Sequence, residues 1–98
     1  EKNKYCIEVK NYSESPLTDK IFTAPRTNNL IRWWTKLNIQ AAQGNQEALL
    51  FFKYNRSPIF VVTADKPKNF SLWININFLG CYVMVADEWL KNETPEFL

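Results

Sequence analysis

At 98 residues, of which 46% are apolar and 15% aromatic, the chain makes a single small domain over residues 1–98 and is not intrinsically disordered. Without a histidine, and with no apolar run longer than residues 81–86, it has neither a Ser-His-Asp or Cys-His nucleophile pair nor a membrane-spanning helix. Its net charge of +2 divides into −1 over residues 1–19, +6 over 20–70 and −3 over 71–98, a basic centre that suits either a phosphate-facing or an ordinary solvated surface.

The first predicted element is a strand over residues 4–10. Tyr5, Ile7 and Val9 alternate there with more polar residues, and we expect Val9 to point into the core. Residues 11–28 are polar, contain two prolines and show no lasting periodicity, which predicts a loop. Loops of this length in a compact domain are usually functional or mobile.

The clearest helix follows this loop. Asn28 or Asn29 can cap its start, and Gly44 stands where a left-handed residue is expected after its end. One broad apolar face is formed by Leu30, Ile31, Trp33, Trp34, Leu37 and Ala41, and the polar stripe beside it by Arg32, Lys36, Gln40 and Gln43. We therefore expect Trp33 and Trp34 to be core residues first of all.

The second half of the chain is rich in predicted strands. Residues 48–54 and 59–63 are apolar runs joined by turn residues, which predicts a hairpin of buried strands. Alternation over residues 71–78 predicts a half-exposed strand, and residues 81–85 predict one more. Asp87 is expected to cap a short C-terminal helix.

This order of elements predicts an α/β fold, a mixed sheet of about five strands with one main crossover helix and a short C-terminal helix. The crossover makes the strands at 4–10 and 48–54 parallel neighbours. Cys6 and Cys81 are too few for a disulfide framework and too far apart for a zinc cluster, so we expect two buried free thiols. Since no secretory signal is visible either, we expect the protein in the cytoplasm.

The tripeptide Glu8-Val9-Lys10 is the strongest candidate for chemistry. Residues two apart on a strand point to the same face, so a carboxylate and an ammonium are presented side by side. This arrangement suits metal-assisted phosphodiester hydrolysis, in which Glu8 and the Val9 carbonyl hold Mg²⁺ and Lys10 orients or activates the attacking water. The alternative is a surface ion pair without function.

The surroundings of the tripeptide strengthen the first reading. An acid-x-Lys strand, a polar-striped helix containing Trp-Trp, an apolar strand and a hairpin together resemble the PD-(D/E)xK nuclease superfamily, and in particular its small phage and archaeal members similar to Holliday-junction resolvases. The segments that carry the resemblance are Ile7–Asn11, Ile31–Trp34, Gln40–Ala42, Ala48–Val62 and Val83–Leu90. It implies a restriction-endonuclease-like core.

The resemblance also implies roles for individual residues. Glu8 would be the metal-binding acid, Val9 a carbonyl ligand, Lys10 the catalytic lysine and Gln40, or else Lys36, the polar helix residue facing the site. Mg²⁺ or Mn²⁺ is the implied cofactor. The family also has an acid on the strand before this motif; the candidates are Glu1, Glu14 and Asp19, or a residue upstream of position 1 in an N-terminally truncated domain.

DNA is the implied partner, and branched DNA would need only shape and backbone contacts. A phosphate-binding groove is predicted from Lys20, Arg26, Arg32, Lys36, Lys53 and Arg56. A homodimer would be needed to cut both strands of a junction.

Two alternatives to a metal-dependent DNA endonuclease remain. One is a catalytically inactive nucleic-acid-binding module of the same fold, because the upstream acid is missing. The other is a viral protein–protein interaction domain, because Trp73, Tyr82 and Trp89 could form an interface and not a core.

Overall fold

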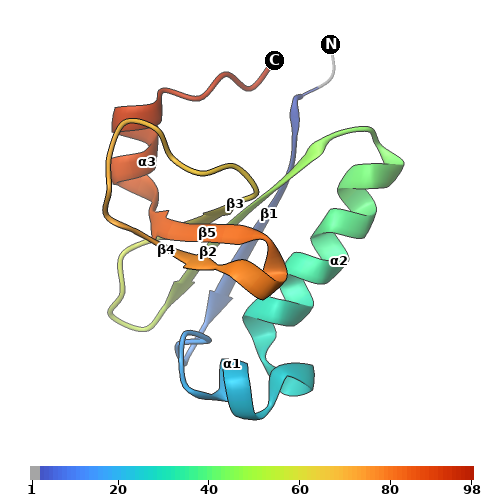
Figure 1. Ribbon diagram of the computed structural model, residues 1–98, viewed down its shortest axis with the longest axis vertical. Helices are drawn as coiled ribbons and strands as arrows, with labels where there is room; N and C mark the ends of the chain where they lie inside the picture. Colours follow the sequence, from blue (N-terminus) through green and yellow to red (C-terminus); the bar gives the residue numbers. More distant parts are fainter. Residues whose placement is uncertain (1–2) are drawn as a thin grey trace.

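Residues 3–98 are described by a computed structural model, in which a five-stranded sheet carries α2 on one face and α3 on the other (Figure 1). The strands are β1 (Tyr5–Tyr12), β2 (Glu47–Tyr54), β3 (Phe60–Thr63), β4 (Trp73–Ile76) and β5 (Cys81–Val85). The α-helices are α1 (Lys20–Thr23), α2 (Asn29–Gln43) and α3 (Ala86–Glu93), and 3₁₀ turns cover Pro25–Thr27 and Asn77–Leu79. The predicted α/β class, with a mixed sheet and one main crossover helix, is confirmed.

The sheet order is β1-β2-β3-β5-β4, with β1 and β2 parallel and the other pairs antiparallel. α2 connects the two parallel strands, as the sequence predicts. The register places Glu8 opposite Leu50 and Lys10 opposite Phe52. Since Leu50 and Phe52 pack in the core beneath α2, the side chains of Glu8 and Lys10 lie on the same face of the sheet as this helix.

The ends of α2 agree with the sequence in one respect and differ in another. Asn28 caps the start, because its side-chain oxygen accepts a hydrogen bond from the N–H of Ile31. The expectation for Gly44 is wrong: its φ is −95°, and Asn45, with φ 52°, adopts the left-handed conformation. Asparagine tolerates this region because its short side chain can hydrogen-bond locally.

Two other local expectations are also wrong. The segment 11–28 is not simply a loop, because it contains α1 and a 3₁₀ turn, anchored by the buried Ile21 and by the Asn28 side chain, which donates to the carbonyl of Pro16. Asp87 does not cap α3; the N-cap position is held by Val85, and Asp87 lies in the first helical turn. There its carboxylate still interacts favourably with the helix dipole.

The orientation of Val9 reverses the prediction. Its side chain is 70% exposed and that of Ile7 41% exposed, because β1 is an edge strand and α3 packs mainly on β3 and β5. Only the start of β1 is covered on this face, where the rings of Tyr5 and Trp89 meet at 6.4 Å. The predicted strand at 71–78 is also shorter than expected, since β4 ends at Ile76.

The two cysteines are free, but they differ in burial. Cys81 is completely buried, as expected, whereas Cys6 is only half-buried. Burial raises the pKa of Cys81 from 9.0 to about 12. The unfolded thiol therefore ionises first, so this group's contribution to the free energy of unfolding is complete below about pH 9 and declines as the pH rises toward 12.

A thiol titration tests this difference. With a chromogenic disulfide reagent at about pH 8, we expect the native chain to react quickly at Cys6, while Cys81 reacts only on unfolding, because the reactive thiolate is disfavoured by burial. Cys6→Ser should remove the fast phase and leave the slow one. Equal rates for both thiols in the native chain would contradict the burial of Cys81.

Candidate active site

A cavity of about 330 Å³ lies between β1 and α2. It is lined by Glu8, Lys10, Asn29, Arg32, Trp33, Lys36, Leu37 and Gln40. Five residues that the sequence singled out for catalysis or phosphate contact are therefore gathered around one hollow, two of them from β1 and three from α2.

The pair at the centre of the cavity comes from alternate positions of β1. The Nζ atom of Lys10 lies 3.2 Å from Oε1 of Glu8, and each side chain is slightly more than one-third exposed. An ion pair this accessible contributes only about 0–1 kcal/mol to stability. Stability alone therefore gives little reason for these two residues at these positions.

The two faces of β1 have the reverse of the usual polarity. The charged side chains of Glu8 and Lys10 face the covering helix, whereas the apolar side chains of Ile7 and Val9 face solvent. A strand built only for stability would bury the apolar face. Such local conflicts between sequence and fold are expected at functional sites.

The opposite wall of the cavity is one side of α2. Arg32, Lys36 and Gln40 follow one another at intervals of four residues, so their side chains project from the same side of the helix. Together with Lys10 and Glu8 they leave a net charge of +2 around the cavity, which favours an anionic ligand.

Three residues of this wall are not among the predicted site residues: Asn29, Trp33 and the core residue Leu37. Trp33 was assigned to the core; it is half-buried, its ring lies 5.8 Å from that of Tyr12 and 6.1 Å from that of Phe52, and it also forms a side of the cavity. Asn29 lies one turn before Trp33. Asn29, Trp33, Lys36 and Gln40 follow the helical period, and this spacing is the signal that could have identified Asn29 and Trp33.

The remaining basic candidates lie elsewhere. Arg26 borders a separate hollow on α2 that also touches Arg32 and Lys36, so it continues the basic surface. Lys20 lies beyond the start of α2, in a hollow that shares Asn29 with the site.

Two basic candidates belong to the end of β2 and to the turn that follows it. Lys53 alternates with the core residue Phe52 and therefore points to the opposite face of the sheet, where its ammonium donates to the carbonyl of Tyr54. Arg56 lies in the exposed turn after β2, with φ 65°.

Carboxylates are scarce around the cavity. Within residues 3–98, Glu8 is the one acid that lines it, and this part of the chain contains no group of three or more potential metal-ligating side chains. Glu14 lines the hollow beyond Asn29, and Asp19 is exposed next to α1. Glu1, the remaining candidate for the second acid, lies outside the described residues.

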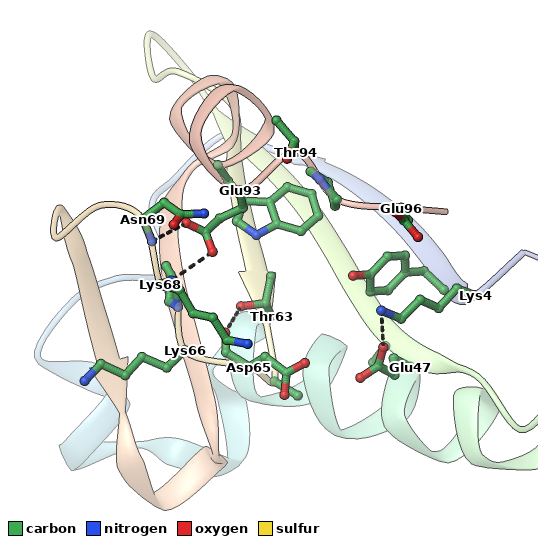
Figure 2. A pocket seen from close by; sticks show the side chains of 16 residues that line it. Lys4, Glu47, Thr63, Asp65, Lys66, Lys68, Asn69, Glu93, Thr94 and Glu96 are labelled. Carbon is green, nitrogen blue, oxygen red and sulfur yellow. Dashed lines mark hydrogen bonds and ion pairs between the residues drawn. The ribbon is translucent and has the colours of Figure 1, made fainter. Parts of the chain in front are cut away.

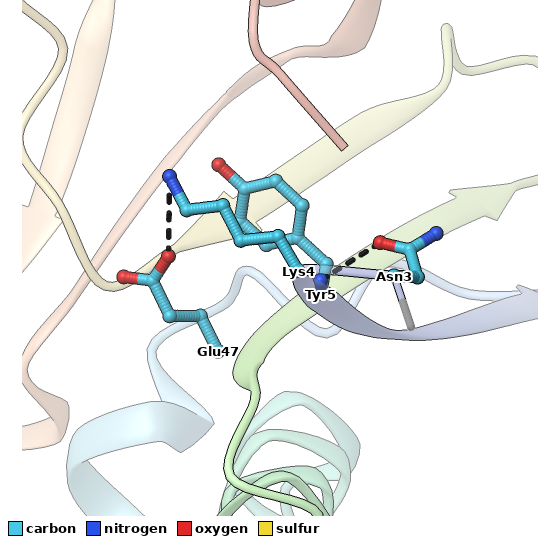
Figure 3. A network of polar contacts seen from close by, with 4 residues as sticks. All are labelled: Asn3, Lys4, Tyr5 and Glu47. Carbon is cyan, nitrogen blue, oxygen red and sulfur yellow. Dashed lines mark hydrogen bonds and ion pairs between the residues drawn. The ribbon is translucent and has the colours of Figure 1, made fainter. Parts of the chain in front are cut away.

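A larger cavity, of about 370 Å³, lies at the other end of β1 and β2 (Figure 2). Of the four carboxylates that line it, those of Glu47 and Glu93 have partners, and Asp65 and Glu96 supply the other two. Glu47 pairs with Lys4 at 3.5 Å, and both oxygens of Glu93 accept backbone N–H groups, from Lys68 and Asn69 (Figures 2 and 3). The Glu93 contacts attach the loop after β3 to α3, which is a structural role.

Two neighbouring groups in this second cavity, Lys4 and Tyr5, have shifted pKa values. The Tyr5 phenol and the Glu47 carboxylate raise the pKa of Lys4, and burial raises the pKa of Tyr5 (Figure 3). Both shifts keep the groups in their usual neutral-pH forms. Neither Lys4 nor Tyr5 therefore has an ionisation that suits acid–base catalysis near neutral pH.

The aromatic residues considered for an interface are mostly internal. Trp89 is 5% exposed, and the half-buried rings of Trp73 and Tyr82 pack edge to face at 5.3 Å. Among the helices of residues 3–98, none combines the length and apolar character needed to cross a bilayer.

Comparisons with known proteins give one family match for this chain. Searches of curated proteins and of solved structures found no match. One protein-family model, described as "Phage putative PDDEXK endonuclease", matches residues 1–92 and so includes both walls of the cavity. The chain belongs to this family of phage PDDEXK endonucleases.

Proposed function

We propose that the chain is a divalent-metal-dependent DNA endonuclease whose active site is the cavity between β1 and α2. The observation that carries the proposal is the position of the Glu8–Lys10 pair on the helix-covered face of an edge strand, opposite Arg32, Lys36 and Gln40. Membership of the endonuclease family supports nuclease chemistry. Metal dependence and the choice of DNA substrate are the parts that this proposal adds.

The donor atoms fit a magnesium ion. Mg²⁺ takes oxygen ligands, keeps several waters and is commonly bound by one or two carboxylates together with substrate phosphates. Glu8 supplies one carboxylate to the cavity. The backbone carbonyl of Val9, between Glu8 and Lys10, would be the second protein ligand, although Val9 does not line the cavity and its side chain is exposed. When bound there, the metal would stabilise negative charge on the phosphate and lower the pKa of a bound water.

The chain's own residues then divide the remaining tasks. The Lys10 ammonium, with three donors, orients the attacking water or a phosphate oxygen from its position beside Glu8. Arg32 can bind a phosphate through two parallel hydrogen bonds, and Lys36 adds a second positive charge. Gln40, which can both donate and accept, holds the water on the helix side.

Branched DNA is the substrate class that these features favour. The basic side chains Arg32 and Lys36, with Arg26 beside them, form a surface suited to phosphates and carry no pattern for reading base edges. Recognition through backbone positions allows DNA shape to select the substrate. The rival function is an inactive DNA-binding module of the same fold, which the single carboxylate in the cavity favours.

Cleavage by matched variants tests the site. We expect Glu8→Gln and Lys10→Ala each to lower the cleavage rate by about 10²-fold or more, because each removes a group that acts on the reacting phosphate. Glu88→Gln and Lys91→Ala make the same chemical changes on α3 and should leave the rate unchanged. Cleavage should require Mg²⁺ or Mn²⁺ on the order of millimolar, since one carboxylate binds weakly, and chelation should abolish it.

The same assay distinguishes the alternatives through its substrates. A four-way junction should be cut faster than a linear duplex of the same sequence. Equal cleavage by wild type and Glu8→Gln would exclude this cavity as the active site. DNA binding without cleavage in either metal would favour the inactive module.

Binding measurements test the basic wall. Each phosphate contact adds roughly 0.9 to the slope of log affinity against log salt concentration. The double variant Arg32→Ala/Lys36→Ala should therefore reduce this slope by about 2, whereas Lys91→Ala should not change it. An unaltered slope in the double variant would show that DNA binds on another surface.

A further inference from the structure

The outer edge of β4 is an unusual surface for this protein. β4 forms the last strand of the sheet, and no strand within residues 3–98 pairs with its other side (Figure 1). Around it, Leu72 is 79% exposed, Ile74 52% and Phe78 60%. Exposed apolar side chains grouped along a free strand edge mark an interaction surface.

The sequence of this edge is uncharged, although the ammonium of Lys66, from the loop after β3, lies 5.4 Å from the centroid of the Trp73 ring on β4. Residues 69–86 contain no Asp, Glu, Lys or Arg, although the whole chain has 22 such residues. The opposite edge of the sheet differs, because β1 carries Glu8 and Lys10 and the N–H of Lys4 before it donates to the carbonyl of Phe97. Natural edge strands are commonly protected by charged residues or by a covering segment. β1 has both kinds of protection, whereas β4 has no charged residue of its own and pairs with no strand of residues 3–98 on its outer edge.

An apolar hollow of about 410 Å³ continues the β4 edge on the face of the sheet that carries α2. The exposed Leu72 and Ile74 line it together with the half-buried Leu17 and Phe60 and the buried Val83. The edge and the hollow together provide backbone groups and adjoining apolar area, which is what pairing with another strand requires.

We propose that β4 pairs with β4 of a second copy of this chain across a two-fold axis, forming a continuous ten-stranded sheet. Antiparallel pairing across such an axis places a segment against itself, so charged side chains tend to meet like charges. An uncharged segment avoids this repulsion. Its apolar side chains can pack against the same side chains of a second copy. They carry no charge that would favour binding to a different, charged protein.

The register follows from the side-chain pattern. With the axis at Ile74, this residue faces its own copy, and Leu72 of each chain lies beside Ile76 of the other on the α2 face of the sheet. Because β4 has only four residues, backbone pairing alone is weak, and these apolar contacts carry the affinity. The candidate active sites would lie on the two outermost strands, about 43 Å apart for nine strand spacings. Dimer formation therefore does not depend on the nuclease assignment.

Light scattering coupled to size-exclusion chromatography, without DNA or metal, tests the proposal. We expect wild type to approach twice the 11.6 kDa of one chain as its concentration rises into the micromolar range. Ile74→Lys should raise the dimer dissociation constant at least about tenfold, because it places two like charges together at the axis. Leu72→Lys, outside the regular strand, gives a second test if Ile74→Lys disturbs folding by circular dichroism.

Ile39→Lys is the matched control, because Ile39 is 58% exposed on α2, away from β4, and should leave the dimer intact. Wild type that stays monomeric over the whole concentration range would overturn the proposal. So would folded Ile74→Lys and Leu72→Lys variants that dimerise like wild type, or dissociation by Ile39→Lys to the same extent.

Discussion

The parallel pairing of β1 with β2 through α2 is the constraint on which the candidate site depends. Joining two parallel neighbours requires a crossover, and here the crossover is a helix of 15 residues that packs on the same face of both strands. The face of β1 beneath the helix bears Cys6, Glu8 and Lys10. Any alternative pairing that shifted β1 by one residue would put Val9 under the helix and turn both charges away from it.

α2 has two tasks on adjacent sides. One side of the helix fills the core over β2 with Leu30, Trp34, Leu37 and Ala41. The neighbouring side, with Arg32, Lys36 and Gln40, lines the cavity next to the edge strand β1. The apolar side keeps the helix in position, since full burial of a leucine stabilises by roughly 1.5–3 kcal/mol. The accessible charges add little stability. The apolar core thus fixes α2 beside β1, and the polar cavity between them lies at the edge of the sheet, where it is accessible to phosphates.

Much of this arrangement could be predicted from the sequence. The 3.6-residue period of α2, its Asn28 cap and the long apolar run of β2 identified the crossover, and from it the parallel pairing of β1 with β2. The orientation of β1 could not be predicted correctly. Alternation along the strand shows that it has two different faces but does not show which of them is buried. The apolar side chains of Ile7 and Val9 indicate that their face is buried, which is wrong. Their face is exposed because β1 lies at the edge of the sheet, and the sequence of the strand does not reveal that position. Lys53 points away from the cavity for a related reason. Strand β2 is apolar on both faces, so its sequence does not show which face lies under α2. Trp33 could be predicted as a packing residue. That it also lines the cavity depends on the position of α2 relative to β1, which the sequence does not give.

The most direct test of the central claim is the position of the divalent cation. In a two-dimensional amide spectrum of the labelled chain, paramagnetic Mn²⁺ broadens the signals of nuclei close to it. The account predicts selective broadening of the amides of residues 8–10 and of the facing turn of α2 near Gln40, with the effect lost in Glu8→Gln. Broadening centred instead on the Glu47 and Asp65 cavity, or unchanged by Glu8→Gln, would contradict it.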